Sequence, residues 1–194
     1  MSQKLLKIGV AGLGRLGRRY AENLARHVPR ARLDAVCSPI ADEVDWAREQ
    51  LGVQRAYADY AAMLADPELD AVFLITPTSL HPQQIEQALD AGKHVFCEKP
   101  LSLRMDECLR TVEHARRHPG LRAMVGFVRH FDASYRQAKT RIDDGAIGKP
   151  FLVYSQTADL FDPSGAFVKF APTSGGIFLD CSVHDVDLAR WLLG

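Results

Sequence analysis

Residues 7–17 read KIGVAGLGRLG, and this stretch decides the fold. The apolar run 7–11 is typical of a buried strand, and residues 15–27 have the apolar spacing of an amphipathic helix. The three glycines between them allow a tight turn, close approach of the backbone to a pyrophosphate and close packing of the helix, whose N-terminus attracts anions. A GxGxxG pattern alone is weak evidence. Its position between a strand and a helix favours a dinucleotide site over a plain glycine-rich turn.

The residues of this turn are the first candidate cofactor-binding group. Arg15 adds positive charge beside the expected phosphates, although a solvated helix face is the alternative interpretation of Arg15, Arg18 and Arg19. The candidates are Gly12, Gly14, Arg15, Leu16 and Gly17.

Strands and helices alternate through residues 1–125. Further strands are predicted at 32–37, 70–76, 94–98 and 122–129, and helices at 41–51, 59–64, 82–91 and 102–118. The run at 70–76 is apolar throughout, as in strands buried on both faces of a parallel sheet, and Gly92 occupies the position of a left-handed helix cap. This order predicts an α/β fold with a doubly wound parallel Rossmann sheet in residues 1–125.

Residues 126–194 follow a different pattern. A helix is predicted at 132–144, a strand at 151–157 and a helix at 176–193, with a loop rich in Pro, Gly and Ser before the last helix. These elements are too few to bury their apolar faces alone. We therefore expect the first part of an incomplete α+β domain for substrate binding and oligomerisation.

The composition excludes several classes of function. The 194 residues include 24 Lys and Arg against 24 Asp and Glu, so no net charge attracts the chain to nucleic acid or to an anionic membrane. The longest apolar run, residues 71–75, is too short to span a bilayer, and the N-terminus lacks the apolar core of a signal peptide. The four cysteines lack CxxC spacing, so we expect neither a disulfide nor a zinc site. A cytoplasmic protein with a small-molecule partner is expected.

The end of the second strand bears on the choice between NAD and NADP. An NAD enzyme usually has an acidic residue there for the ribose 2′-hydroxyl, but this sequence has Ser38. A serine neither repels a 2′-phosphate nor binds the ribose diol as strongly as a carboxylate, and Arg15 could neutralise that phosphate. No arginine directly follows Ser38, so NAD is favoured and NADP stays open.

Polar residues follow two neighbouring strands of the predicted sheet. Ligands of this fold bind outside the carboxyl ends of the strands, so these residues are positioned to meet the nicotinamide and the substrate. His81 is equally consistent with a helix start, and the Glu98-Lys99 pair with surface charge. The candidates are Thr76, Pro77, Ser79, His81, Glu98 and Lys99.

The last predicted helix carries a carboxylate and an imidazole. If the helix is continuous, Asp180 and His184 are four residues apart on one face, with Asp187 near them. Such a pair suits proton transfer, although taken alone it is more often a structural polar contact. No third metal ligand is apparent, so no metal site is predicted. The other histidines have no recognisable spacing and are interpreted as surface or strand-end residues: His27, His94, His114, His118 and His130.

Four motifs together resemble the Gfo/Idh/MocA oxidoreductase family in order and spacing, and within it the inositol dehydrogenases. The resemblance covers essentially the whole chain, and the lysine motif combined with the Asp-x-x-x-His segment is its specific part. The motifs are Gly12-x-Gly14-x-x-Gly17, Thr76-Pro77 with His81, Glu98-Lys99-Pro100, and Gly175-Gly176-x-x-x-Asp180-x-x-x-His184-x-x-Asp187.

The resemblance implies hydride transfer between a nicotinamide cofactor and a secondary alcohol of a cyclitol or sugar. It implies that His184 is the general base and that Lys99 holds positive charge against the developing alkoxide. Asp180 would bind the substrate hydroxyl, and Arg129 would contact the substrate. Which of Lys99 and His184 finally holds the proton is open.

Two other functions compete with an inositol dehydrogenase. One is a sugar dehydrogenase or reductase of the same family, and the other is a dinucleotide-binding regulator without catalysis. Members of the family continue well past the Asp-x-x-x-His segment, so the chain is expected to be a truncated portion with an incomplete substrate pocket. We expect a homo-oligomer, with residues 151–194 prone to association.

Overall fold

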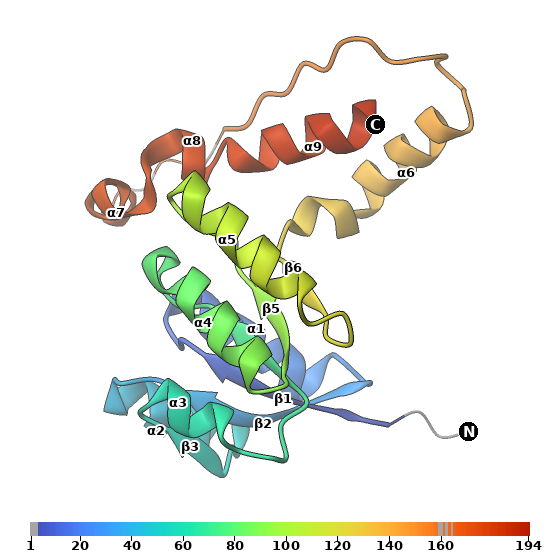
Figure 1. The fold of residues 1–194 in the computed structure, drawn as a ribbon. Helices are drawn as coiled ribbons and strands as arrows, with labels where there is room; N and C mark the ends of the chain where they lie inside the picture. The colour runs from blue at the N-terminus through green and yellow to red at the C-terminus, as the bar shows by residue number, and fades with distance from the viewer. Residues whose placement is uncertain (1–3, 159–160, 162, 164) are drawn as a thin grey trace. The chain divides into compact units, whose positions relative to one another are not determined.

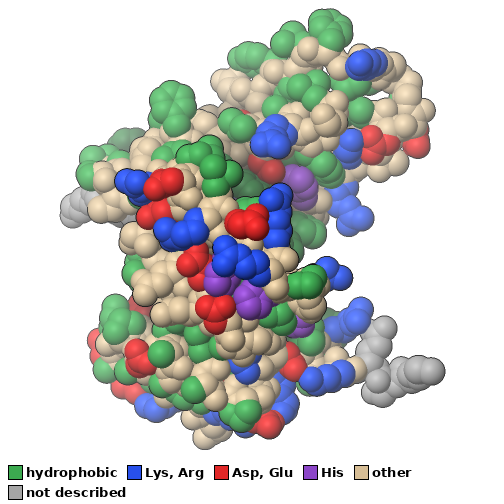
Figure 2. Space-filling model, in the orientation of Figure 1, with side chains coloured by type: hydrophobic (Ala, Val, Ile, Leu, Met, Phe, Trp, Pro, Cys, Tyr) green, Lys and Arg blue, Asp and Glu red, His purple; other side chains and the backbone are tan. Residues whose placement is uncertain are grey.

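The computed structural model describes residues 4–158, 161, 163 and 165–194. The chain divides into two compact units, residues 1–125 and 126–194, and each is described by itself. Within the described residues, no helix combines the length and apolar character needed to cross a bilayer. Figure 2 shows acidic and basic side chains interspersed on the visible face, in keeping with the balanced composition.

The first unit is built on one six-stranded sheet with the order β3-β2-β1-β4-β5-β6 (Figure 1). Each pair of neighbouring strands is parallel, and the order reverses direction between β1 and β4. This confirms the predicted Rossmann sheet. The strands are β1 (Leu6–Ala11), β2 (Ala31–Cys37), β3 (Arg55–Tyr57), β4 (Ala71–Leu74), β5 (His94–Cys97) and β6 (Ala123–Val125).

Helices cover both faces of this sheet. Buried residues of α1 and α2, such as Leu24 and Ala47, pack in one core, while Met63 of α3 and Leu89 of α4 belong to a second core. Parallel strands need such cover on both sides because both of their faces are apolar. The helices are α1 (Arg15–Arg26), α2 (Ala41–Leu51), α3 (Tyr60–Leu64), α4 (His81–Asp90) and α5 (Met105–Arg116), with a 3-10 turn, η1 (Thr78–Leu80).

Two details of this unit differ from the prediction. Strand β3 has only three residues, all half-buried, and its sequence carries no alternation; it exists because it pairs with β2. The last strand ends at Val125 rather than at Arg129, because the chain turns into a 3-10 helix, η2 (Val128–Phe131). The predicted left-handed cap at Gly92 is confirmed, with φ of 74°.

In the second unit the regular elements of the described residues are helical: η2, α6 (Ala133–Asp143), α7 (Ala166–Ser174), α8 (Gly176–Asp180) and α9 (Val183–Leu193). The predicted strand at 151–157 is wrong, because no described segment pairs with it. Part of the predicted loop is α7, although residues 159, 160, 162 and 164 lie outside the described residues.

The predicted helix 176–193 is two helices. Ser182 N–H donates to Ile177 O at 2.9 Å, one residue beyond the α-helical spacing, and the next bonds, from His184 to Cys181 O and from Asp185 to Ser182 O, span three residues. Ser182 is the N-cap of α9, although its side chain makes no capping hydrogen bond. Asp180 therefore ends α8, and His184 belongs to the first turn of α9, so the pair does not share one continuous helix face.

Candidate active site

The glycine turn between β1 and α1 is packed so closely that two of its glycines are obligatory. Gly12 has φ of +86°, and a Cβ there would lie 2.5 Å from Ile75 O. A Cβ on Gly17 would lie 1.9 Å from Gly12 O. These contacts bring the start of α1 against the turn, as a dinucleotide fingerprint requires.

Gly14 is different because a Cβ there would meet no atom of the chain within 4 Å. Gly14 is the N-cap residue of α1, and its φ of −63° is one that any residue type can adopt without strain. The following residues, Arg15 and Leu16, are exposed. The turn thus presents open space at a helix N-terminus, and a pyrophosphate fits there.

Ser38 follows β2 and is already engaged within the chain. Its side chain is buried, its hydroxyl donates to Glu43 Oε2 at 2.6 Å, and it accepts from the Ile40 N–H at 3.1 Å. A hydroxyl has two acceptor sites, so one remains for a ribose hydroxyl. The contact also brings a carboxylate to the end of β2. Sequence reasoning missed Glu43 because it lies five residues past the position where the acid was expected.

His81 lies in the interior, with 1% of its surface exposed. Its two ring nitrogens each lie 2.9 Å from a backbone carbonyl oxygen, that of Thr76 after β4 and that of Pro100 after β5. Burial lowers the pKa of His81, and the two carbonyl contacts oppose that shift. The imidazole joins the two loops at the carboxyl end of the sheet.

The rest of the β4 rim is polar. Thr76 Oγ1 donates to Gln84 Oε1 at 2.5 Å, while Pro77 and Ser79 are exposed. Two of the four candidates of this rim, Pro77 and Ser79, are therefore accessible to a ligand.

Glu98 is a buried carboxylate that fixes the backbone beside Lys99. One oxygen accepts from the Lys99 N–H at 3.0 Å, and the other accepts from the Tyr20 hydroxyl at 2.5 Å. Burial, followed by the contact with Glu98, raises the pKa of Tyr20. The Tyr20 ring packs on Phe73 of β4 and Phe96 of β5, so Tyr20 links α1 to both strands as well as to Glu98. Tyr20 is 78 residues from Glu98 in the sequence, and no spacing pattern points to it.

In the second unit, Arg129 is held by a network centred on Asp185. Arg129 Nη1 lies 2.7 Å from Asp185 Oδ1, and the same oxygen accepts from the hydroxyls of Ser155 at 2.6 Å and Thr157 at 2.8 Å. The hydrogen bond from the Ser155 hydroxyl lowers the pKa of Asp185 to about 2, together with the hydrogen bonds from the Thr157 hydroxyl and the Arg129 guanidinium. The sequence analysis did not single out Asp185, which holds the guanidinium of the predicted substrate-contacting residue Arg129 in place.

The remaining candidates of this unit are Asp180 and His184, both half-buried. The His184 ring meets Phe127 edge-on, with 6.2 Å between the ring centres. His130, interpreted from the sequence as a surface or strand-end residue, stacks on Trp191 at 4.2 Å and bonds Asp187 at 2.6 Å. Asp187 and Trp191 therefore anchor α9 to η2.

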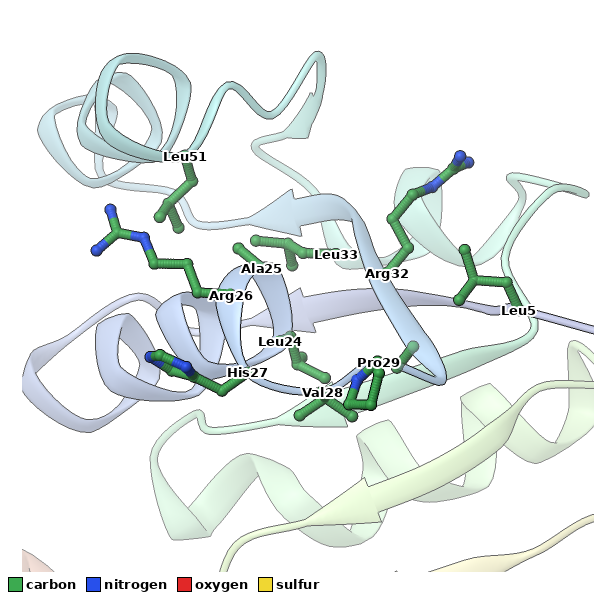
Figure 3. Close-up of a pocket in the computed structure, with 11 residues that line it drawn as sticks. Leu5, Leu24, Ala25, Arg26, His27, Val28, Pro29, Arg32, Leu33 and Leu51 are labelled. Atoms are coloured by element: carbon green, nitrogen blue, oxygen red, sulfur yellow. The ribbon is translucent and has the colours of Figure 1, made fainter.

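Within the first unit, a cavity of about 720 Å³ lies at the end of the sheet opposite the glycine turn and the Glu98-Lys99 rim. Figure 3 shows side chains of α1, the start of β2 and the end of α2 around it, among them Leu24, Leu33 and Leu51. These residues stand near the amino ends of the strands, whereas ligands of this fold bind beyond the carboxyl ends. The cavity is thus separate from the candidate site.

Two family matches together cover nearly the whole chain. Residues 6–127 match the oxidoreductase family with an NAD-binding Rossmann fold, and residues 135–194 match the Gfo/Idh/MocA C-terminal domain. The chain belongs to the Gfo/Idh/MocA family. The open glycine turn and the Glu98-Lys99 rim of this Gfo/Idh/MocA chain are therefore parts of an NAD-binding Rossmann domain.

Several relatives of known activity are similar over 97% of the chain. A scyllo-inositol 2-dehydrogenase (NAD(+)) of Bacillus subtilis is 43% identical, and a myo-inositol 2-dehydrogenase of Thermotoga maritima is 37% identical. A crystal structure of scyllo-inositol dehydrogenase from Lactobacillus casei, with bound NAD(H) and scyllo-inositol, is 44% identical with a TM-score of 0.92. The chain covers 54% and 55% of the two relatives and 56% of the crystallised chain, so it spans about half of their length.

Proposed function

We propose that the protein is an NAD-dependent dehydrogenase that oxidises a secondary alcohol of a cyclitol, with an inositol as the first candidate. The observation that carries the proposal is the similarity, over 97% of the chain, to a structure that holds NAD(H) and scyllo-inositol. In the first unit, the open space at Gly14 would take the cofactor pyrophosphate, and Lys99 at the sheet rim would supply positive charge.

The cofactor, when bound, accepts the hydride from the alcohol carbon. His184 takes the hydroxyl proton, and Lys99 holds positive charge beside the developing alkoxide. Asp180 would accept a hydrogen bond from a hydroxyl of the substrate other than the one that gives its proton to His184. Arg129, fixed by Asp185, donates to other hydroxyls of the polyol, because its planar fork of N–H groups suits neighbouring oxygens.

Glu98 and His81 act as positioning residues in this proposal. Glu98 holds the Lys99 backbone, and His81 joins the carbonyls of Thr76 and Pro100 on either side of the rim. Both are buried, so they order the rim without meeting the substrate.

An assay with a panel of polyols tests the function. The protein, mixed with NAD and single polyols, should form NADH fastest with an inositol isomer and more slowly with open-chain or hexose substrates. A clear preference for a hexose would support the sugar dehydrogenase instead. Binding of NADH without turnover on any polyol would support a regulator.

The cofactor choice is expected to depend on Glu43. Its carboxylate sits 2.6 Å from Ser38 Oγ, near the expected ribose, and would repel the 2′-phosphate of NADP. Glu43→Gln keeps an oxygen for the Ser38 hydroxyl and removes the charge. We expect the ratio of NADP affinity to NAD affinity to rise by about tenfold, measured by calorimetric titration.

Glu49→Gln is the matched control for that variant, because Glu49 is an exposed residue of the same helix, α2. It should leave the ratio unchanged. An equal change in both variants, or none in Glu43→Gln, would show that the 2′-position lies elsewhere.

Self-association is the last part of the proposal. Large apolar side chains of the second unit are strongly exposed, including Phe151, Leu152 and Tyr154. Exposed apolar surface of this kind is typical of a subunit contact, which supports a homo-oligomer.

A further inference from the structure

The first unit carries a cluster of three metal-ligating side chains that the proposed function does not use. Asp90 is the last residue of α4, and His114 and His118 flank the end of α5. One ligand atom from each residue lies within 4.8 Å of the other two. We propose that Asp90, His114 and His118 form a binding site for a divalent transition-metal ion of the Zn²⁺, Co²⁺ and Ni²⁺ class.

The geometry is close to that of a three-ligand site. The Nε2 atoms of His114 and His118 lie 2.8 Å and 3.3 Å from the same oxygen, Oδ1 of Asp90. Bonds of about 2.0–2.1 Å to a tetrahedral ion separate its ligands by about 3.3 Å. The imidazole rings stack with centres 5.2 Å apart, so both present Nε2 to the same side. Small side-chain rotations would place an ion between the three atoms.

The chemistry of the ligands selects the class of ion. Two imidazoles and one carboxylate suit Zn²⁺, Co²⁺ and Ni²⁺, whereas Mg²⁺ and Ca²⁺ prefer oxygen ligands throughout. Three protein ligands leave one position for water. His114 belongs to the last turn of α5, and His118 follows the C-cap Arg117 in a turn closed by a bond from its N–H to Ala115 O at 3.0 Å.

The surroundings favour a cation. The carboxyl ends of α4 and α5 meet at this cluster, and each helix end carries partial negative charge. Two nearby arginines are paired, Arg110 with Glu86 and Arg116 with Glu113, and a third, the exposed Arg117, directly precedes His118. Figure 2 shows histidine side chains on the visible face of the molecule with both acidic and basic side chains beside them.

A bound ion would join α4 to α5. The two helices are already linked along their length by Glu86 Oε1, which accepts from Arg110 at 3.1 Å and from Thr111 at 3.1 Å. An ion at their carboxyl ends adds a second link, and binding to the folded state alone raises its stability. The exposed Asp90 and the partly exposed histidines give the ion direct access from solvent.

Co²⁺ titration tests the site with the reduced, chelator-treated chain. We expect one equivalent to bind, with a visible spectrum free of thiolate charge-transfer bands, and the thermal midpoint to rise by about 2–8 °C at saturation. His114→Ala and His118→Ala should each weaken binding at least tenfold and remove the rise. Asp90→Asn, which keeps the side-chain shape, should also weaken binding.

His27→Ala is the matched control, since His27 is an exposed histidine of the same unit outside the cluster. Its Co²⁺ affinity should equal that of the unmodified chain, and circular dichroism should show that all variants are folded. The proposal is overturned if no Co²⁺ binds, if the spectrum shows thiolate ligation, or if binding survives in folded His114→Ala and His118→Ala chains.

Discussion

Lys99→Met should reduce kcat for inositol oxidation by about a thousandfold or more while the Kd for NADH changes by no more than a few-fold. The lysine's charge acts chiefly as the alkoxide develops, so its loss weakens the transition state far more than the bound cofactor. The backbone at this position should survive the change, because Glu98 contacts the Lys99 N–H rather than its ammonium. Initial rates of NADH formation and a separate NADH titration measure the two effects.

Lys139→Met is the matched control, because Lys139 is a surface lysine of α6 that pairs with Asp143 in the next turn. It should leave both kcat and Kd near the values of the unmodified protein. Near-normal turnover of Lys99→Met on its best substrate would show that the charge of Lys99 has no role in the chemistry.

Gly17→Ala and Gly14→Ala should have opposite consequences although both replace a glycine of the same turn. The Gly17 Cβ would lie 1.9 Å from Gly12 O, and backbone on both sides would have to move, which should cost about 3 kcal/mol or more of unfolding free energy. The Gly14 Cβ meets nothing in the chain, so Gly14→Ala should fold with nearly unchanged stability and lose NADH affinity instead.

Urea unfolding measures the first effect and calorimetry the second. Gly120→Ala is the control for both, because that position also has no atom within 4 Å of the added Cβ and lies in a loop away from the turn. Equal stability of Gly17→Ala and Gly120→Ala would mean that the turn is looser than the structure shows.

The sequence predicted the parts of the fold that depend on neighbouring residues. The strand, glycine turn and helix at residues 6–26 are such a part, since apolar spacing and glycine content are local properties. Strand β3 was missed because three half-buried residues carry no pattern of their own. The break between α8 and α9 was missed because the apolar spacing continues across Ser182, where the backbone hydrogen bonds change their spacing.

In the candidate site too, the sequence predicted what depends on neighbouring residues and missed contacts between distant ones. Lys99 and its neighbours were predicted as site residues because the carboxyl end of a parallel strand is where this fold binds ligands. Tyr20 on Glu98 and Asp185 on Arg129 join residues 78 and 56 positions apart, so only the folded chain brings them together. Glu43 reaches Ser38 from the first turn of the following helix, which a search confined to the strand end does not cover.

If the glycine turn of the first unit holds the pyrophosphate of NAD(H), calorimetric titration of the chain with NADH should show it. We expect saturable binding of one equivalent and a loss of at least tenfold in affinity in a folded Gly14→Ala chain, whose added Cβ enters the open space. Absence of NADH binding by the folded chain, or unchanged affinity in folded Gly14→Ala, would contradict it.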